Sequence, residues 1–380
     1  MDLYYKREIQ EAIERKLFKG KVVVIYGARQ VGKTTLVNTI QAKYAATSTY
    51  YNCDEPDIRA ALTDKTSTEL KAFLGSKDLV ILDEAQRVRN IGLTLKLLVD
   101  TFPHTQIVAT GSSSFDLSNE VIEPLTGRKY EFYLYPLSLR ELSKKYLMRE
   151  LERLLERRMI FGMYPEIVSA EGDVTDRLKA LVRSYLYKDV LRVDKIKNSE
   201  AVERLLKALA LQIGHEVSYN ELAETVGVNK NTVMGYMRIL EQAFIIFRLN
   251  PFSRNVRNEL KKLRKVYFYD TGLRNALINN LNPLELRQDT GALWENFMLA
   301  ERLKYNQYRQ ADVNAYFWRT QDKSEIDYLE EAGGTLSAYE IKWRKDTARW
   351  PKAFQGAYPH AKLAVIHRGN FGAFVGLPTA

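Results

Sequence analysis

Eight consecutive residues, Gly27 to Thr34, form the most specific chemical pattern in the chain, Gly-Ala-Arg-Gln-Val-Gly-Lys-Thr. The two glycines let the backbone turn with its N–H groups pointing inward, where they can surround a polyphosphate. Lys33 can reach the β- and γ-phosphates, and the Thr34 hydroxyl can complete the shell of a Mg²⁺ ion. The pattern predicts a loop that binds ATP and Mg²⁺ through Gly27, Ala28, Arg29, Gln30, Val31, Gly32, Lys33, Thr34 and Thr35.

Two adjacent carboxylates end a second apolar run. Leu79 to Leu82 is followed directly by Asp83 and Glu84, so both acids lie where a buried strand would end. Beside a bound triphosphate, Asp83 can hold Mg²⁺ through water, and Glu84 can polarise the water that attacks the γ-phosphate. Together with the loop, this pair predicts ATP hydrolysis, with Lys33 and Glu84 as catalytic residues.

Ser112 and Arg128 are further candidates for the catalytic centre. Ser112 follows the apolar run 106–110, where it can contact the γ-phosphate or the attacking water; a serine-rich turn is the alternative. Arg128 can stabilise charge on the phosphoryl group of a neighbouring subunit, as guanidinium groups do in phosphoryl transfer. An ordinary surface arginine fits the same sequence equally well.

The apolar runs beside these side chains are the elements that must position them. Residues 22–25 are all β-branched, which suits a strand buried on both faces of a parallel sheet. Further strands are expected at 49–53, 79–83 and 106–110, with helical segments between them. An amphipathic helix is expected within residues 1–20. Such alternation predicts an α/β fold with a doubly wound parallel sheet.

The order of these motifs resembles the AAA+ superfamily of P-loop ATPases. The chain looks most similar to a prokaryotic branch that carries a C-terminal domain of unknown function, and residues 161–165, Phe-Gly-Met-Tyr-Pro, resemble the glycine–proline turn after the ATPase core of that branch. The resemblance implies a parallel sheet with a helical lid, and ATP and Mg²⁺ as cofactors. It also allows a homo-oligomer in which Arg128 reaches the next subunit. The matching motifs are Gly27–Thr34, Asp83–Glu84, Gly111–Ser113 and Thr126–Arg128.

A helix-turn-helix pattern follows in the middle of the chain. Residues 219–228 read as a helix ending in a glycine turn, and Asn229 can cap a second helix over 230–243. The strand-like run 244–249 can then open a wing. Two short helices joined by such a turn resemble a winged-helix module.

Basic side chains of this region are candidate DNA contacts, because lysine and arginine bind phosphates in a salt-dependent manner. The alternative is a winged helix that only connects domains. The candidates are Lys230, Asn231 and Arg238 on the second helix, and Arg254, Arg257, Lys261, Lys262, Arg264 and Lys265 in the basic run that follows.

The last third of the chain offers a second set of residues for chemistry. Gly333-Gly334 suits a two-residue hairpin turn, and counting outward from it places Asp327 opposite Glu340, with Lys342 on the same face. Facing carboxylates are unfavourable unless something neutralises them, and a second divalent metal would do so. This arrangement resembles the core of PD-(D/E)xK nucleases, although no Pro-Asp pair is present. In that resemblance Glu295 matches the helical acid. Solvated strand charges are the alternative.

Composition bounds these interpretations. The 380 residues include 57 Lys and Arg against 47 Asp and Glu, a net charge of +10 that makes a polyanionic partner plausible. A single cysteine, Cys53, excludes an intrachain disulfide framework, and the four histidines lack the spacing of a zinc site. With neither a signal region nor an apolar run long enough for a membrane span, we expect a soluble cytoplasmic protein without membrane contact.

The expected organisation has four parts: an ATPase core over residues 1–136, a helical lid and connector over 137–210, a winged-helix domain over 211–275 and an α/β restriction-endonuclease-like domain over 276–380. The leading hypothesis is an ATPase that couples nucleotide turnover to DNA binding. Two alternatives remain: an ATP-gated, metal-dependent DNA nuclease using Asp327, Glu340 and Lys342, and a nucleotide-dependent protein-interaction switch without DNA.

Overall fold

The computed structural model describes residues 4–111, 125–185, 196, 198–252, 264–320, 322, 324–344 and 347–378. The chain divides into two units. The first comprises residues 1–136 with 242–244, and the second comprises residues 137–241 with 245–380. The four-part organisation expected from the sequence stays a prediction.

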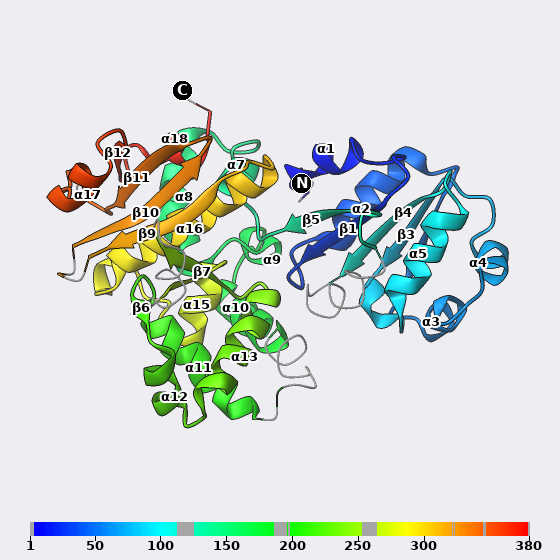
Figure 1. The fold of residues 1–380 in the computed structure, drawn as a ribbon, viewed down its shortest axis with the longest axis horizontal. Helices are drawn as coiled ribbons and strands as arrows, with labels where there is room; N and C mark the ends of the chain where they lie inside the picture. Colours follow the sequence, from blue (N-terminus) through cyan, green and yellow to red (C-terminus); the bar gives the residue numbers. More distant parts are fainter. Residues whose placement is uncertain are drawn as a thin grey trace. The chain divides into compact units, whose positions relative to one another are not determined.

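The first unit contains a five-stranded parallel sheet in the order β2-β3-β4-β1-β5 (Figure 1). All residues of β1, β3 and β4 are buried, because strands covered on both faces use continuous apolar runs. The strands expected from the sequence are therefore confirmed. Their bounds are β1 (Val22–Gly27), β2 (Ser48–Asn52), β3 (Leu79–Asp83), β4 (Gln106–Gly111) and β5 (Lys129–Leu134).

Helices connect these strands, as a doubly wound sheet requires. The first helix is shorter than expected: it ends at Glu14, and Phe18 turns the chain with a φ of 58°. Leu17 still packs into the core from outside the helix, with 4% exposure. The helices are α1 (Ile9–Glu14), α2 (Lys33–Gln41), α3 (Pro56–Leu62), α4 (Ser67–Leu74) and α5 (Ile91–Thr101), with 3₁₀ turns at Ala42–Tyr44 and Ala85–Arg87.

The second unit is organised on a seven-stranded sheet in the order β12-β11-β10-β9-β7-β8-β6. Parallel pairing of β7 with β9 joins the small antiparallel set β6, β7 and β8 to the C-terminal strands. The predicted domain boundary after residue 275 therefore divides the strands of one sheet between two domains. The strands are β6 (Glu216–Val217), β7 (Ile246–Pro251), β8 (Arg264–Phe268), β9 (Asn314–Arg319), β10 (Glu325–Ala332), β11 (Thr335–Ile341) and β12 (Lys362–Ile366).

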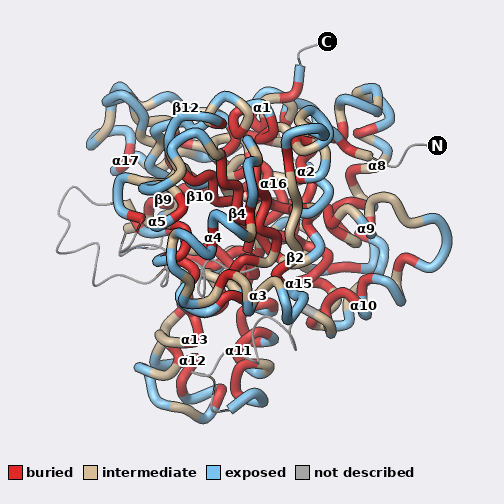
Figure 2. Tube along the Cα trace, turned by 90° about the vertical axis from the view of Figure 1, so that its right-hand side faces the viewer, coloured by how far each residue is buried: buried red, intermediate tan, exposed pale blue. Residues whose placement is uncertain are grey.

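The helices of the second unit fall into two runs along the chain. The first run is α7 (Leu139–Leu142), α8 (Met148–Phe161), α9 (Pro165–Val168), α10 (Val174–Tyr185), α11 (Ser199–Leu211), α12 (Tyr219–Val226) and α13 (Lys230–Gln242). The second is α15 (Thr271–Leu277), α16 (Thr290–Tyr308), α17 (Lys352–Ala357) and α18 (Phe371–Phe374), with 3₁₀ residues Leu284–Leu286 before α16. Figure 2 shows buried chain along β10 and α16 and exposed stretches on α12 and α13.

The turn at Gly162 has a packing role. Gly162 ends α8 with a φ of 84°, and a Cβ there would lie 2.1 Å from Oδ1 of Asp270. The Asp270 carboxylate accepts the N–H of Met163 at 2.6 Å and caps α15 through the N–H of Leu273 at 2.9 Å. The glycine thus allows α8 and α15 to approach closely, which explains part of the motif at residues 161–165.

The C-terminal hairpin matches its prediction. Gly333 and Gly334 both have positive φ, 53° and 77°, as a type I′ turn requires. The strand pairs run from Ala332–Thr335 to Tyr328–Tyr339. A small core of Trp318, Ile326, Leu329, Ala338 and Phe354 packs against this sheet.

Candidate functional site

The loop between β1 and α2 has the backbone that the glycine spacing predicts. Gly32 has a φ of 94° and Gln30 a φ of 60°, so the chain turns sharply before α2 begins at Lys33. A Cβ on Gly27 would lie 2.4 Å from the carbonyl oxygen of Leu134. Glycine is therefore required at this position, because the loop leaves the sheet in close contact with β5.

Lys33 is buried and turned into this loop. Its ammonium donates to the carbonyl oxygens of Gly27 and Ala28, each at 3.0 Å. Arg7, which the sequence reasoning missed, supports the same loop: its guanidinium donates to the carbonyl oxygens of Val31 and Tyr135, each at 2.5 Å. The loop is thus held in shape by contacts to its backbone carbonyls, while cationic side chains stay close to it.

Asp83 lies beside the loop, as its position at the end of β3 predicts. The Thr34 hydroxyl donates to Oδ2 of Asp83 at 2.6 Å, and the Tyr50 hydroxyl donates to the same oxygen at 2.7 Å. The Thr110 hydroxyl, at the end of β4, donates to Oδ1 of Asp83. Three neighbouring elements therefore fix one buried carboxylate, 2% exposed, next to the start of α2.

Glu84 follows in a left-handed conformation, with a φ of 53°. Its backbone N–H donates to the Thr110 hydroxyl at 3.1 Å, and its carboxylate accepts from the Gln86 amide at 2.6 Å. Thr110 thus joins the two acids. Sequence reasoning missed Thr110, although it lies at the carboxyl end of a predicted strand, because its contact with Asp83 depends on β4 lying next to β3.

Ser112 lies outside the described residues. Arg128 immediately precedes β5, and its carbonyl oxygen accepts the N–H of Val22 at the start of β1. It therefore lies at the amino edge of the sheet, opposite the edge that holds Lys33, and it pairs with Asp100 at 2.7 Å. The role of Arg128 toward a neighbouring subunit stays a prediction.

Cys53 does not have the properties of a nucleophile. It is fully buried, and burial, followed by the nearby Asp83 carboxylate, raises the pKa of its thiol to about 12. Thiolates are the reactive form of cysteine, so Cys53 acts as a small core residue.

Comparison with known proteins agrees with this geometry. Residues 19–143 match the family model of an AAA domain. The match covers the amino-terminal third of the chain and, at the level of the family, supports ATP binding and hydrolysis there. Residues 152–284 and 290–375 match two domains of unknown function, DUF8612 and DUF4143.

Whole-chain relatives extend the match beyond this domain. An uncharacterized protein of Mycobacterium tuberculosis is 28% identical over 377 residues, covering 97% of this chain and 81% of the relative. One of Methanocaldococcus jannaschii is 28% identical over 328 residues, covering 78% and 73%. Among solved structures, the Walker-type ATPase of Pyrococcus abyssi aligns with a TM-score of 0.51 at 15% identity, covering 72% of this chain and 96% of that one. That similarity shows a shared fold.

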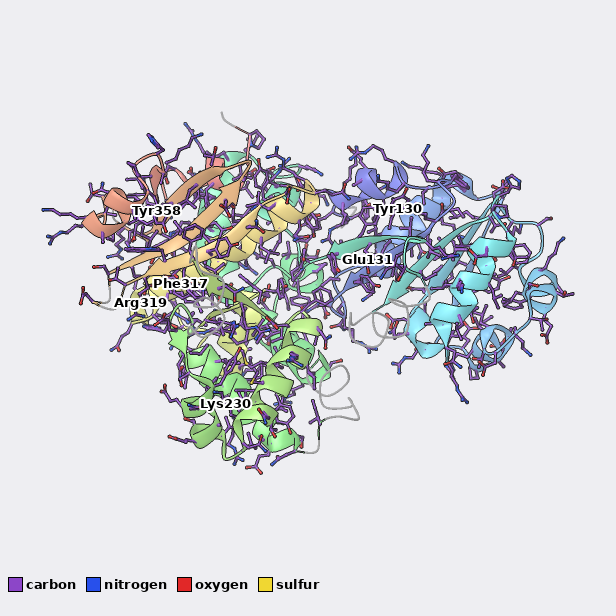
Figure 3. The ribbon with its side chains drawn as sticks, viewed as in Figure 1. Tyr130, Glu131, Lys230, Phe317, Arg319 and Tyr358 are labelled. Carbon is purple, nitrogen blue, oxygen red and sulfur yellow. The ribbon has the colours of Figure 1, made fainter. Side chains whose placement is uncertain are left out.

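The predicted helix-turn-helix is present as α12 and α13, joined by a turn in which Gly227 has a φ of 76°. The Asn229 side chain accepts the N–H of Thr232 at 2.8 Å, which is the predicted cap. Lys230, Asn231 and Arg238 are all exposed, and Figure 3 places Lys230 on the helical part of the second unit. The predicted contacts Arg254, Arg257, Lys261 and Lys262 lie outside the described residues.

The structure brings Asp327, Glu340 and Lys342 together. Lys342 donates to Oδ2 of Asp327 at 3.1 Å and pairs with Oε2 of Glu340 at 2.6 Å. The same Asp327 oxygen accepts the N–H of Ile341 at 2.8 Å. Burial, followed by the nearby Asp327, raises the pKa of Glu340 to about 7.

Glu295 belongs to a neighbouring buried cluster. Its Oε1 accepts from the Tyr267 hydroxyl at 2.6 Å and pairs with the ammonium of Lys265 at 3.3 Å. Lys265 also pairs with Glu325, and its ammonium lies 5.7 Å from the centre of the Phe317 ring. Figure 3 shows Phe317 and Arg319 on β9, and Arg319 pairs with Glu325 at 3.4 Å. Lys265 was expected among the DNA contacts, but its side chain is 1% exposed between Glu295 and Glu325, so that expectation is wrong.

These contacts do not fit the second divalent metal expected between Asp327 and Glu340. Among the described residues, no three Asp, Glu, His or Cys side chains are grouped to hold a metal ion. Lys342 and Lys265 instead supply positive charge beside the acids. The neutralising group that the facing carboxylates require is thus an ammonium in this structure.

Within the described part of the chain, no helix combines the length and apolar character needed to cross a membrane.

Proposed function

We propose that this protein binds and hydrolyses ATP at the loop between β1 and α2 and couples the turnover to DNA binding by its helix-turn-helix. The observation that carries the ATPase assignment is the 2.6 Å contact between Thr34 and Asp83. It joins the phosphate-binding motif to the acidic motif at the carboxyl edge of one parallel sheet, where α/β folds bind nucleotides.

The residues of the loop have distinct roles in this proposal. The Lys33 ammonium, which now contacts the carbonyls of Gly27 and Ala28, turns to the β- and γ-phosphates. The amides after Gly27 and the start of α2 bind the remaining phosphate oxygens. The N–H groups are thereby fixed in place before the phosphates bind, and stabilisation of phosphate charge by such groups and by the lysine accelerates phosphoryl transfer.

Asp83 and Glu84 divide the remaining work. Thr34 would hold Mg²⁺ directly and Asp83 would hold it through a water molecule, since hydroxyl, water and phosphate oxygens are ligands that this ion prefers. Bound there, Mg²⁺ would neutralise charge on the phosphates. Glu84 orients the attacking water, and Thr110 keeps the backbone of Glu84 next to Asp83.

DNA binding is proposed on three grounds. The elements α11, β6, α12, α13, β7 and β8 follow in the order of a winged helix, with β8 paired to both β6 and β7. Lys230, Asn231 and Arg238 leave α13 on its exposed side. The chain carries a net charge of +10, which favours a polyanionic partner.

DNA cleavage by the C-terminal strands is the weaker alternative. The order α16, β9, β10, β11, α17 and β12, with β11 parallel to β12, agrees with the nuclease resemblance of the sequence. The absence, among the described residues, of any three Asp, Glu, His or Cys side chains grouped to hold a metal ion argues against it, because this cleavage chemistry needs a bound metal. Incubating plasmid DNA with Mg²⁺ or Mn²⁺ decides, since Asp327→Ala must remove any cleavage that depends on this site.

The test of the proposed function is the ATPase rate with and without duplex or single-stranded DNA. We expect turnover that changes when DNA is added at low salt, and Glu84→Gln should bind ATP while losing hydrolysis. ATP turnover that ignores DNA, together with no DNA affinity at low salt, would favour the protein-interaction switch. Normal hydrolysis by Glu84→Gln would show that another residue orients the water.

A further inference from the structure

Tyr50 is a contact of Asp83 that neither nucleotide motif contains. It lies on β2, next to β3 in the sheet, and its hydroxyl donates to Oδ2 of Asp83 at 2.7 Å. In the strand register Tyr50 faces Ile81 and Asn52 faces Asp83. Side chains two residues apart share one face of a strand, so the long phenol of Tyr50 reaches forward along that face to the carboxylate.

The three donors to Asp83 differ in their other duties. Thr34 lies in the first turn of α2 and is itself the expected metal ligand. Thr110 also accepts the N–H of Glu84, so its hydroxyl serves two acids. The Tyr50 hydroxyl contributes to the site through its hydrogen bond to Asp83.

In the 2.7 Å contact the Tyr50 hydroxyl is the donor and the Asp83 carboxylate oxygen is the acceptor. A hydrogen bond of this kind to a carboxylate is stronger than one between two neutral groups. Donors that orient a metal-binding carboxylate tune both its geometry and its affinity for the ion.

We propose that Tyr50 is a positioning residue for the magnesium site of the proposed ATPase, holding the Asp83 carboxylate in the orientation that the metal requires. This inference rests on the proposed function. It assigns to Tyr50 no contact with ATP or with the attacking water. Its effect must therefore appear in the magnesium dependence of turnover and not in metal-free nucleotide binding.

The experiment compares Tyr50→Phe with Tyr51→Phe. Both changes remove one hydroxyl from neighbouring residues of β2 and keep the ring. The Tyr51 hydroxyl donates to the carbonyl of Phe73 at 3.3 Å, and its ring stacks on Phe73 with centroids 4.7 Å apart, away from Asp83. Each variant is assayed for ATPase rate against free Mg²⁺, and for ATP binding in excess chelator.

We expect Tyr50→Phe to need about tenfold more Mg²⁺ for half-maximal turnover. This is the lower end of the loss in metal affinity that follows removal of a hydrogen bond to a metal-binding residue. Its metal-free ATP affinity should equal that of the unchanged protein, which also shows that the loop is folded. Tyr51→Phe should match the unchanged protein in both assays.

Two results overturn the inference. The first is that Tyr50→Phe and Tyr51→Phe need the same Mg²⁺ concentration for half-maximal turnover. The second is that Tyr50→Phe loses metal-free ATP affinity as strongly as it loses turnover, which would mean that Tyr50 supports the loop. Lys33→Ala separates these failures from failure of the proposed function. If Lys33→Ala keeps full turnover, the nucleotide site itself is wrong. If it is inactive while Tyr50→Phe is normal, only the role of Tyr50 fails.

Discussion

At the nucleotide site, the side chains that belong to a sequence motif could be predicted from the sequence. Those that contact the site from a neighbouring strand could not. Lys33, Thr34 and Asp83 have fixed spacing from glycines or from the end of an apolar run. Tyr50 and Thr110 contact Asp83 only because β2 and β4 lie on either side of β3. That adjacency is a property of the sheet order, which no local pattern encodes.

Glu295 gives a prediction at the same scale, because burial raises its pKa from 4.5 to about 7 despite the attraction of Lys265. Between these pH values the folded protein holds a proton that the unfolded chain has released, so this group's contribution to stability falls as pH rises. Glu295→Gln removes the effect. The free energy of unfolding of the variant, relative to the unchanged protein, should rise between pH 5 and pH 8, with a slope of up to about 1.4 kcal/mol per pH unit.

Urea unfolding at several pH values measures this difference, and Glu285→Gln provides the control because Glu285 is exposed. A difference for Glu295→Gln that does not change with pH would mean that Glu295 stays ionised in its pair with Lys265.

At the scale of elements, the contact between α8 and α15 yields a matched pair of glycine substitutions. Gly162→Ala places a methyl group against Asp270, whereas Gly172→Ala meets no atom within 4 Å. Both glycines have positive φ, 84° and 90°, so each variant suffers backbone strain of about 1–2 kcal/mol. Only Gly162→Ala must also displace the carboxylate that accepts the N–H of Met163. It should be the less stable of the two in thermal unfolding, and equal losses would contradict the packing role of Gly162.

Local elements could be predicted where the pattern is local. The Gly333-Gly334 turn and period-two alternation give the correct hairpin, and Asn229 correctly marks the start of α13. Pairing of β7 with β9 could not be predicted, because β8, α15 and α16 lie between these strands in the chain. The sequence also suggested a metal between Asp327 and Glu340. The alternation of the strand places Lys342 on the same face as these acids, but it does not show that the Lys342 ammonium contacts both carboxylates.

At the scale of the whole molecule, the proposal requires that exposed residues of α13 bind the DNA backbone. Lys230→Ala and Arg238→Ala should weaken duplex DNA binding for all sequences. Each lost phosphate contact should lower the slope of log affinity against log salt concentration by about 0.9. Lys207→Ala is the matched control, since Lys207 is an exposed lysine on the neighbouring helix α11. Fluorescence anisotropy over a salt series measures the slopes, and equal slopes for all three variants would remove α13 from the interface.

The central claim is that ATP binds where β1 turns into α2, and the affinity of Lys33→Ala for ATP tests it most directly. Lys43→Ala serves as control, because Lys43 follows the same helix but pairs with Glu14 at 2.7 Å. Titration calorimetry with ATP and Mg²⁺ should show saturable binding to the unchanged protein and to Lys43→Ala, and none to Lys33→Ala. Equal ATP affinity in all three proteins would contradict the account.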